Sequence, residues 1–286
     1  MSSTEQKRTI LVTGANRGIG FIIVKKLAKE SPPNNTIILL GSRDLKRGED
    51  ALIQLGSPSN VHVLHLDTSS RESIIRAKDE VKQKYGGQLD VVINNAAITR
   101  KDLNVDAARE ILGTNYYGVK ILNEYLFPLM RENGRIINVS SRVGSNVLYE
   151  ASQSLRQKYT TSTLTKYQLD QLVEEFISAI DTNTLEHLGY NIESTDLIYG
   201  VSKAALNALT QLEAYEWSNN NSLLVVSVTP GFCATDMTGH APDARPAELG
   251  ADSILYMVNA PRSELRNGGF YRDGQQISLI SARISR

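Results

Sequence analysis

Tyr199 and Lys203 stand four positions apart in a Tyr-Gly-Val-Ser-Lys segment. Residues with this spacing share one face of a helix, so both side chains would enter the same pocket. A phenol has a pKa of about 10, and a neighbouring ammonium group lowers it by favouring the phenolate. The pair would then protonate a carbonyl oxygen during reduction, or act as a base in the reverse reaction. The alternative is a solvated helix face, so the assignment depends on the rest of the chain.

The composition is that of an ordinary soluble globular protein. The chain has 286 residues, 41% hydrophobic and 22% charged, which is enough to bury a sizeable core. Lys plus Arg equals Asp plus Glu at 31 each, so no net charge directs the chain to nucleic acid or a membrane surface. The first ten residues lack the apolar region of a secretory signal, and no apolar run approaches the roughly 18 residues of a membrane span. We therefore expect a cytoplasmic protein with no nucleic-acid or membrane partner.

Cysteine and histidine are sparse. Cys233 is the only cysteine, so the chain has no intrachain disulfide and no cysteine metal cluster. Cys233 either lines the site or is a small buried thiol, and the second is more usual. No spacing typical of metal ligands relates the histidines, which are His62, His65, His187 and His240. The sequence therefore predicts no bound metal.

A glycine-rich turn follows the first apolar run, Thr9–Val12. Glycines stand at 14, 18 and 20, and an amphipathic helical pattern begins at Phe21. Backbone N–H groups and the dipole at such a helix start favour a pyrophosphate, and glycines let phosphates approach closely. The pattern predicts a dinucleotide site. The alternative is a tight turn that only packs helix on strand.

The end of the second strand, Thr36–Gly41, distinguishes the two nicotinamide cofactors. An acidic residue there would bind the ribose hydroxyls of NAD, whereas Arg suits the 2′-phosphate of NADP. Here the strand runs into Ser42 and Arg43, and Arg17 lies in the glycine turn, so NADP is favoured. Either Arg could instead be a solvated surface charge. Asp44 is ambiguous, although it suits the N-cap of a helix beginning at Leu45.

Two further strands end in polar or small residues. Val61–Leu66 ends at Asp67, which would bond the adenine amine or cap the following helix. Leu89–Ile93 runs into Asn94-Asn95-Ala96-Ala97, where small residues would leave room for a cofactor and asparagines could hold loop backbone. A helical pattern from about 105 to 132 then carries Asn115. This side chain is either exposed or turned inward, where it would bond backbone carbonyls and distort the helix.

The fifth strand, Arg135–Val139, runs into Ser140 and Ser141, at the end of the strand where open α/β sheets bind ligands. An insertion with one strong amphipathic helix follows, at about 149–198. The pattern continues with the Tyr199 helix and a sixth strand, Leu223–Val228. It ends with a long loop suited to a substrate lid and a last helix. Strands that alternate with helices predict an α/β fold, a Rossmann-type doubly wound parallel sheet of about seven strands with helices on both faces. We expect a single domain over residues 1–286.

These motifs, taken in order, make the chain resemble the short-chain dehydrogenase/reductase family over most of its length. The insertion, together with Ser42-Arg43-Asp44 and Thr235-Asp236-Met237, resembles the monomeric NADPH-dependent carbonyl reductases. Two residues depart from the family pattern: Ala97 stands where a glycine is usual, and Phe232 where some relatives have Trp. The matching pieces are Thr13–Gly20, Asp67, Asn94–Ala96, Asn115, Ser141, Tyr199 with Lys203, and Pro230-Gly231.

The resemblance implies NADP(H) as cofactor and reduction of a small-molecule carbonyl substrate. Tyr199 would donate the proton, Lys203 would lower the Tyr pKa and bond the nicotinamide ribose, and Ser141 would stabilise the developing charge. Asn115 would hold a water that links Lys203 to solvent. The residues expected to bind the cofactor are Gly14, Asn16, Arg17, Gly18, Ile19, Gly20, Arg43, Asp67, Asn94, Ala96, Tyr199, Lys203, Pro230, Gly231 and Thr235.

Two other functions are compatible with the same motifs. One is a non-catalytic NADP-binding regulator, although a pure binder has no need of an activated phenol. The other is a dedicated biosynthetic reductase or dehydrogenase with one substrate. Relatives often assemble through the helices that carry Asn115 and Tyr199. The insertion is expected to cover that surface, so the sequence predicts a monomer.

Overall fold

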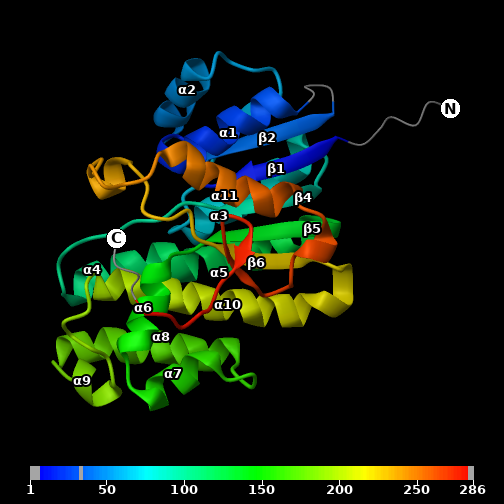
Figure 1. Ribbon diagram of the computed structural model, residues 1–286. Helices are drawn as coiled ribbons and strands as arrows, with labels where there is room; N and C mark the ends of the chain where they lie inside the picture. Colours follow the sequence, from blue (N-terminus) through cyan, green and yellow to red (C-terminus); the bar gives the residue numbers. More distant parts are fainter. Residues whose placement is uncertain (1–6, 32–34, 283–286) are drawn as a thin grey trace.

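One parallel sheet forms the centre of the molecule. The computed structural model describes residues 7–31 and 35–282. Within them eight strands follow the order β3-β2-β1-β4-β5-β6-β7-β8 (Figure 1). Every neighbouring pair is parallel except the last, β7 with β8. The strands are β1 (Arg8–Val12), β2 (Thr36–Ser42), β3 (Val61–His65), β4 (Leu89–Asn94), β5 (Met130–Val139), β6 (Leu224–Val228), β7 (Phe270–Arg272) and β8 (Gln275–Gln276).

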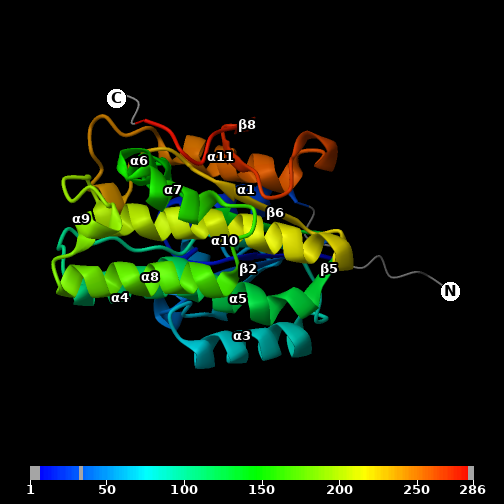
Figure 2. The ribbon, with the colours of Figure 1, turned by 90° about the horizontal axis from the view of Figure 1, so that it is seen from below.

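Helices cover both faces of this sheet, so the predicted Rossmann-type α/β fold is confirmed (Figures 1 and 2). Residues of α1, α2 and α11 pack on one face, and residues of α3, α5 and α10 pack on the other. Alternate strand residues supply the two faces, since successive side chains point to opposite sides. The α-helices outside the insertion are α1 (Gly18–Glu30), α2 (Leu45–Gln54), α3 (Arg71–Lys84), α4 (Val105–Leu112), α5 (Gly118–Leu126), α6 (Arg142–Glu150), α10 (Leu197–Asn221) and α11 (Ala247–Asn259).

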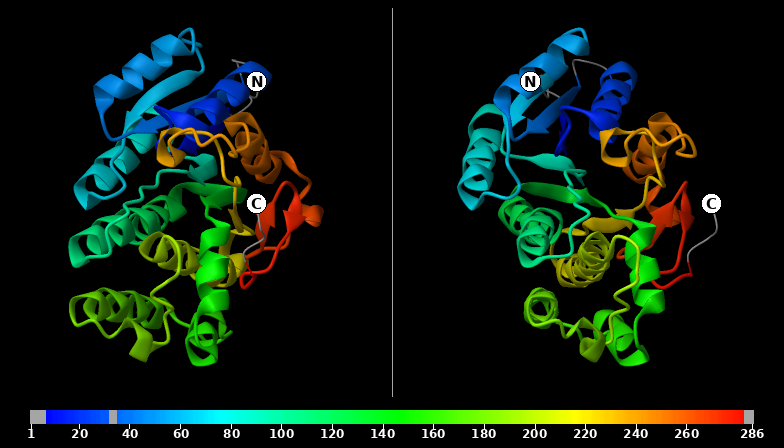
Figure 3. Two further views of the ribbon diagram at one scale, coloured as in Figure 1. Left: turned by 60° about the vertical axis from the view of Figure 1, so that its left-hand side comes forward. Right: turned by 90° about the vertical axis from the view of Figure 1, so that its left-hand side faces the viewer.

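The segment between α6 and α10 holds three helices, whereas one strong helix was predicted. They are α7 (Gln153–Thr160), α8 (Lys166–Asp181) and α9 (Leu185–Leu188). The prediction missed α7 because it buries only Leu155 and Tyr159, and α9 because it has four residues. All three lie outside α10 rather than against the sheet (Figure 3).

Helix α8 covers the surface formed by α4, α5 and α10. Tyr116 and Tyr117, which lie between α4 and α5, donate from their hydroxyls to Asp170 and Glu174 of α8, each at 2.8 Å, and Lys120 of α5 forms an ion pair with Asp170. At the start of α8, Lys166 forms an ion pair with Glu216 of α10 at 2.7 Å. The insertion is thus joined to these helices by polar contacts as well as by a shared apolar cluster.

The predicted helix from about 105 to 132 is interrupted. After α4, residues Gly113–Tyr117 form a π-helix, and α5 then ends in a 3-10 turn, Phe127–Leu129. Strand β5 begins at Met130, five residues before the predicted start, because Pro128 cannot donate to a continuing helix. The other predicted strand boundaries agree with the structure to within one residue. Across residues 7–31 and 35–282, no helix is both long and apolar enough for a membrane span.

Candidate active site

A cavity of about 210 Å³ lies along the carboxyl ends of the parallel strands. The strand order reverses between β1 and β4, and open α/β sheets bind their ligands at such a switch point. Segments that follow β1 to β6 all contribute to the wall. The predicted residues in the wall are Gly14, Asn16, Arg17, Gly18, Ile19, Arg43, Asp67, Ala96, Tyr199, Lys203, Pro230 and Thr235.

The glycine turn has the backbone shape that its sequence predicts. Gly14 has φ +61°, and a Cβ there would lie 2.9 Å from the Cα of Ala96, so only glycine fits against the β4 loop. Asn95 holds the same turn by donating its amide to the carbonyl of Thr13 at 2.9 Å. Gly20 lies outside the cavity wall and packs against Asn95. The turn therefore exposes Gly14 and Gly18 to the cavity and uses Gly20 for packing.

Asn94 and Gly231 also lie outside the wall. The buried Asn94 amide donates to Asn123 at 2.7 Å and to Asn138 at 2.8 Å, so it ties β4 to α5 and β5. Gly231 follows Pro230 in the loop after β6. Neither residue reaches the cavity, although both were expected to bind the cofactor.

Three arginines line the end of the cavity formed by the turns after β1 and β2. Arg17 and Arg43 were predicted, and Arg47 was missed. Arg47 lies in the first turn of α2, whereas Arg43 precedes the N-cap of that helix. The closeness of the two arginines in the sequence, at the end of β2, could have revealed Arg47. Asp44 caps α2 by accepting from the backbone N of Arg47 at 3.0 Å, as predicted. A patch of three guanidiniums suits a phosphate, because Arg offers several N–H donors in a planar fork.

Asp67 does not cap the following helix, since Ser70 is the N-cap of α3. The Asp67 carboxylate instead accepts from the backbone N and the hydroxyl of Ser69, at 2.9 and 2.7 Å. Asp67 also lines the cavity, so its contact with the adenine amine of a cofactor stays a prediction. Arg17 likewise has a partner, Asp236, at 3.2 Å.

Close packing of α6 on α10 brings Ser141 to Tyr199. A Cβ on Gly144 of α6 would lie 2.6 Å from the backbone N of Ala204, so a larger residue would push the helices apart. Ser141 caps α6 by accepting from the N of Val143 at 3.2 Å, and its hydroxyl hydrogen-bonds the phenol of Tyr199. Ser141 therefore caps α6 and bonds Tyr199 at the same time.

The neighbouring serine has another partner. The buried Ser140 hydroxyl donates to the carbonyl of Lys203 at 3.2 Å and does not bond the phenol. Of the two serines, Ser141 bonds Tyr199, whereas Ser140 and not Ser141 lines the cavity wall. The catalytic role of Ser141 stays a prediction.

Burial dominates the protonation of both Tyr199 and Lys203. It raises the pKa of Tyr199 to about 12, and the hydrogen bond from Ser141 opposes this rise. The Lys203 amine lies 5.6 Å from the centroid of the Tyr199 ring and donates to the carbonyl of Val139 at 2.8 Å. Burial lowers the pKa of Lys203 to about 7. The expected lowering of the Tyr199 pKa by Lys203 is therefore not observed, because burial outweighs it and disfavours both charges.

Asn115 turns inward, the second of the two predicted possibilities. Its amide donates to the carbonyl of Ile98 at 2.9 Å and to the hydroxyl of Ser202 at 3.1 Å, and its oxygen accepts from the N of Ile98. These bonds coincide with the π-helical turn Gly113–Tyr117. Asn115 thus links the β4 loop to the residue before Lys203; its role in holding a water stays a prediction.

The long loop after β6 is closed at its base. Backbone bonds join the Arg245 carbonyl to the N of Ala234, and the N of Arg245 to the carbonyl of Phe232. Arg245 also donates from Nη1 to both Asp273 oxygens, at 2.9 and 3.0 Å. The segment between these ends delivers Thr235, Asp236 and Met237 to the cavity wall.

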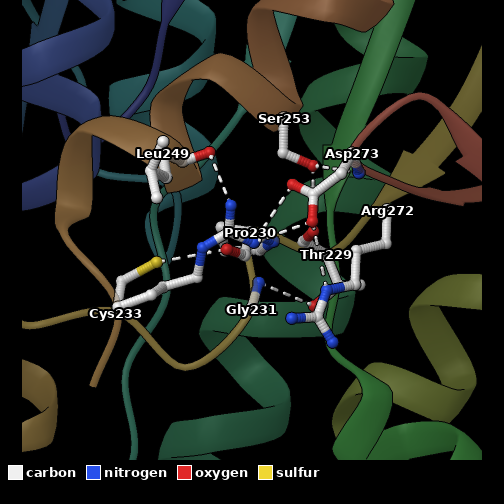
Figure 4. A network of polar contacts seen from close by, with 9 residues as sticks. Thr229, Pro230, Gly231, Cys233, Leu249, Ser253, Arg272 and Asp273 are labelled. Atoms are coloured by element: carbon white, nitrogen blue, oxygen red, sulfur yellow. Dashed lines mark hydrogen bonds and ion pairs between the residues drawn. The ribbon is translucent and has the colours of Figure 1, made fainter. Parts of the chain in front are cut away.

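Cys233 is a buried thiol that donates to the carbonyl of Pro230 at 3.1 Å (Figure 4). It lies outside the cavity wall, and burial raises its pKa. Ala97, one of the two departures from the family pattern, lies in the wall. Among the residues that the structure describes, no group of three His, Cys, Asp or Glu side chains could hold a metal ion.

Comparison with known proteins agrees with this architecture. The chain is 33% identical to "Carbonyl reductase [NADPH] 1" of Bos taurus, with 88% of this chain and 90% of the relative covered. The solved structure of salutaridine reductase from Papaver somniferum has a TM-score of 0.81 and 28% identity, covering 93% of this chain and 99% of that one. Menthone neomenthol reductase from Mentha piperita has a TM-score of 0.75 and 27% identity, covering 92% and 98%.

The family model described as short chain dehydrogenase matches residues 8–174, more than half of the chain. The alignment with the relative from Bos taurus covers 88% of the chain, so it extends beyond the residues that the family model matches. This chain belongs to the short-chain dehydrogenase/reductase family.

Proposed function

We propose that this protein reduces ketones, aldehydes and quinones to alcohols with NADPH, and that Tyr199 donates the proton. One observation carries the proposal: Tyr199, with the Ser141 hydroxyl bonded to it, lies in the wall of the cavity whose other end carries three arginines. A cofactor bound across this cavity would have its phosphate-bearing end at the arginines. Its other end would then lie beside Tyr199.

The residues of the cavity fit an NADP-type dinucleotide. Gly14 packs so closely on Ala96 that no side chain fits at position 14. The backbone N–H groups of the turn therefore stay accessible to a pyrophosphate. Arg17, Arg43 and Arg47 would bind the 2′-phosphate. The relative from Bos taurus is named an NADPH enzyme, which supports NADP(H) here. The remaining contacts would come from Asn16, Gly18, Ile19, Asp67, Ala96, Pro230 and Thr235.

NADPH, when bound, supplies the hydride for the carbonyl carbon. Tyr199 holds its proton at neutral pH because burial raises its pKa to about 12, so it can donate to the carbonyl oxygen. Ser141 would hydrogen-bond the same oxygen and stabilise its developing negative charge. Lys203, held over the Tyr199 ring by the carbonyl of Val139, would contact the nicotinamide ribose.

The test is a panel of carbonyls assayed by NADPH oxidation, with NADH run in parallel. Tyr199→Phe removes only the hydroxyl, so we expect turnover to fall by about 10² to 10⁴ while NADPH binding persists. Binding would be measured by fluorescence titration, and a Tyr215→Phe variant of an exposed tyrosine on the same helix is the control. Near wild-type turnover by Tyr199→Phe would refute the proton-donor role. Tight NADPH binding without turnover of any carbonyl would indicate a regulator instead.

A reductase dedicated to one carbonyl substrate is the second candidate. Its support is the high TM-scores to two enzymes named for particular compounds, salutaridine reductase and menthone neomenthol reductase. Values of kcat/KM across the panel separate the two: similar values indicate a generalist, and a single value larger by several orders of magnitude indicates a dedicated enzyme.

We further propose that residues 1–286 form a single domain and that the protein is a cytoplasmic monomer. The support for the monomer is that α8 occupies the surface of α4, α5 and α10 through Asp170, Glu174 and Lys166. A second copy could not use that surface without displacing the insertion.

A further inference from the structure

Three arginines gather at the carboxyl edge of β5, β6 and β7, outside the wall already described. Arg142 directly follows Ser141, Arg245 closes the base of the loop after β6, and Arg272 ends β7. The three strands are neighbours and run parallel, so the segments that follow them lie side by side. Figure 4 shows Arg272 and Asp273 beside Thr229 and Gly231.

The carboxylate of Asp273 pairs with two of these three arginines. Asp273 accepts from Arg245 Nη1 at 2.9 and 3.0 Å and lies 3.4 Å from Arg272 Nε. Arg142 donates to a neutral group, the carbonyl of Ala282, at 3.3 Å. The basic cluster, defined as Arg142, Arg245, Arg272 and Asp273, therefore holds three positive charges and one negative charge.

The surroundings of Arg142 disfavour its charge. Burial lowers the pKa of its guanidinium, and the positive charge of Arg272 lowers it further. Among the described residues, no carboxylate acts in the opposite direction. A half-buried cation that faces a second cation is stabilised by any anion that enters between them.

The basic cluster adjoins the reacting groups. Ser141, the residue before Arg142, bonds the phenol of Tyr199. Pro230, the residue before Gly231, lines the cavity. A Cβ built on Gly231 would lie 2.9 Å from Cδ of Arg245 and 3.5 Å from Nη2 of Arg272, so both side chains reach this point of the loop. A substrate held at Tyr199 could extend from the cavity to the cluster.

We propose that the basic cluster selects carbonyl substrates that carry a carboxylate, or a comparable anionic group, a few bonds from the reacting carbonyl. Arg142 is the specificity-determining residue, because Arg245 and Arg272 already share Asp273. The inference rests on the proposed carbonyl reduction and names a substrate class for it. The reaction is unchanged: hydride adds to the carbonyl carbon, Tyr199 protonates the oxygen, and the anionic group takes no part in the bond changes.

The test compares keto acids with their own methyl esters. The substrates are aryl ketones in which one to four methylene groups separate the carboxyl group from the carbonyl. The chain length with the highest kcat/KM gives the distance between Tyr199 and the basic cluster that a substrate spans. For the best spacing we expect kcat/KM of the acid to exceed that of its ester by about tenfold, the lower end for a hydrogen bond between charged groups. Raising the ionic strength should reduce this ratio, because salt screens half-exposed charges.

Arg142→Gln should bring the acid-to-ester ratio to about one, and Arg142→Lys should retain part of it. Arg76→Gln, which removes an exposed arginine of α3, is the matched control and should leave the ratio unchanged. Arg272→Gln supplies a second measurement if Arg142→Gln does not fold.

Ester turnover without preference for any acid, or an unchanged ratio in both Arg142→Gln and Arg272→Gln, would overturn this inference and leave the proposed function intact. A wild-type protein that binds NADPH but turns over neither acids nor esters would overturn the proposed function, and this inference with it.

Discussion

Glu213 is a fully buried carboxyl group in the interior of the molecule, and its replacement by Gln tests the packing directly. Its side chain on α10 is 0% exposed and accepts from the amide of Asn123 at 2.8 Å. Asn123 accepts in turn from Asn94, which also bonds Asn138, so the carboxyl ends a chain of buried amides between sheet and helices. Burial raises the pKa of Glu213 from 4.5 to about 8.

The sign of the effect follows from proton counts. Between pH 4.5 and pH 8 the folded protein holds the Glu213 proton and the unfolded chain has lost it, so stability falls as pH rises. One proton corresponds to about 1.4 kcal/mol per pH unit, and the whole window to about 5 kcal/mol. Gln keeps an acceptor for Asn123 and cannot ionise. The Glu213→Gln variant should therefore match the wild type near pH 4.5 and become more stable than it toward pH 8.

Urea unfolding at several pH values between 4.5 and 8, followed by circular dichroism, measures this difference. The slope against urea should be the same in both proteins, since the exposed surface is unchanged. Glu49→Gln is the control, because it removes an exposed carboxylate of α2 that is not among the groups that shift the Glu213 pKa. A stability difference between wild type and Glu213→Gln that does not vary with pH would refute the argument that burial keeps this carboxyl protonated.

Two further predictions concern the cofactor and the assembly. Arg47→Gln should raise KM for NADPH by about tenfold and leave KM for NADH unchanged, because the exposed guanidinium would contact only the 2′-phosphate. Steady-state kinetics with both cofactors measures the two KM values. An equal rise in both would contradict this prediction. The protein should sediment as a monomer, since α8 occupies the surface of α4, α5 and α10; a stable tetramer in analytical ultracentrifugation would contradict this.

Most of the fold could be predicted because its signals are local. Buried parallel strands form apolar runs, and each predicted strand end lies at the carboxyl edge in the structure. The additional strand β8 has two residues and depends on pairing with β7, which no local pattern indicates. The early start of β5 at Met130 likewise depends on pairing of Leu89 with Met130.

The candidate site was predictable where a motif specifies the backbone, as in the glycine turn. It was less predictable where partners come from distant segments. The hydrogen bond of Ser141 to Tyr199 requires the close packing at Gly144, and Arg245 meets Asp273 only through the loop closure. The pKa of Tyr199 was expected to fall because a charge four residues away is visible in the sequence, whereas the burial that raises it is not.

Burial of ionisable groups on α10 connects the active site with the stability of the fold. Tyr199, Lys203 and Glu213 belong to one helix, and Lys203 and Glu213 are almost fully buried. Burial moves the pKa of Lys203 down to about 7 and that of Glu213 up to about 8, so near neutral pH Glu213 is mostly uncharged and Lys203 is charged in only about half of the molecules. Burial is also the main cause of the raised Tyr199 pKa, so the phenol keeps its proton in this environment. The protonation state suited to a proton donor thus follows from burial beneath the surrounding helices rather than from the Tyr–Lys spacing itself.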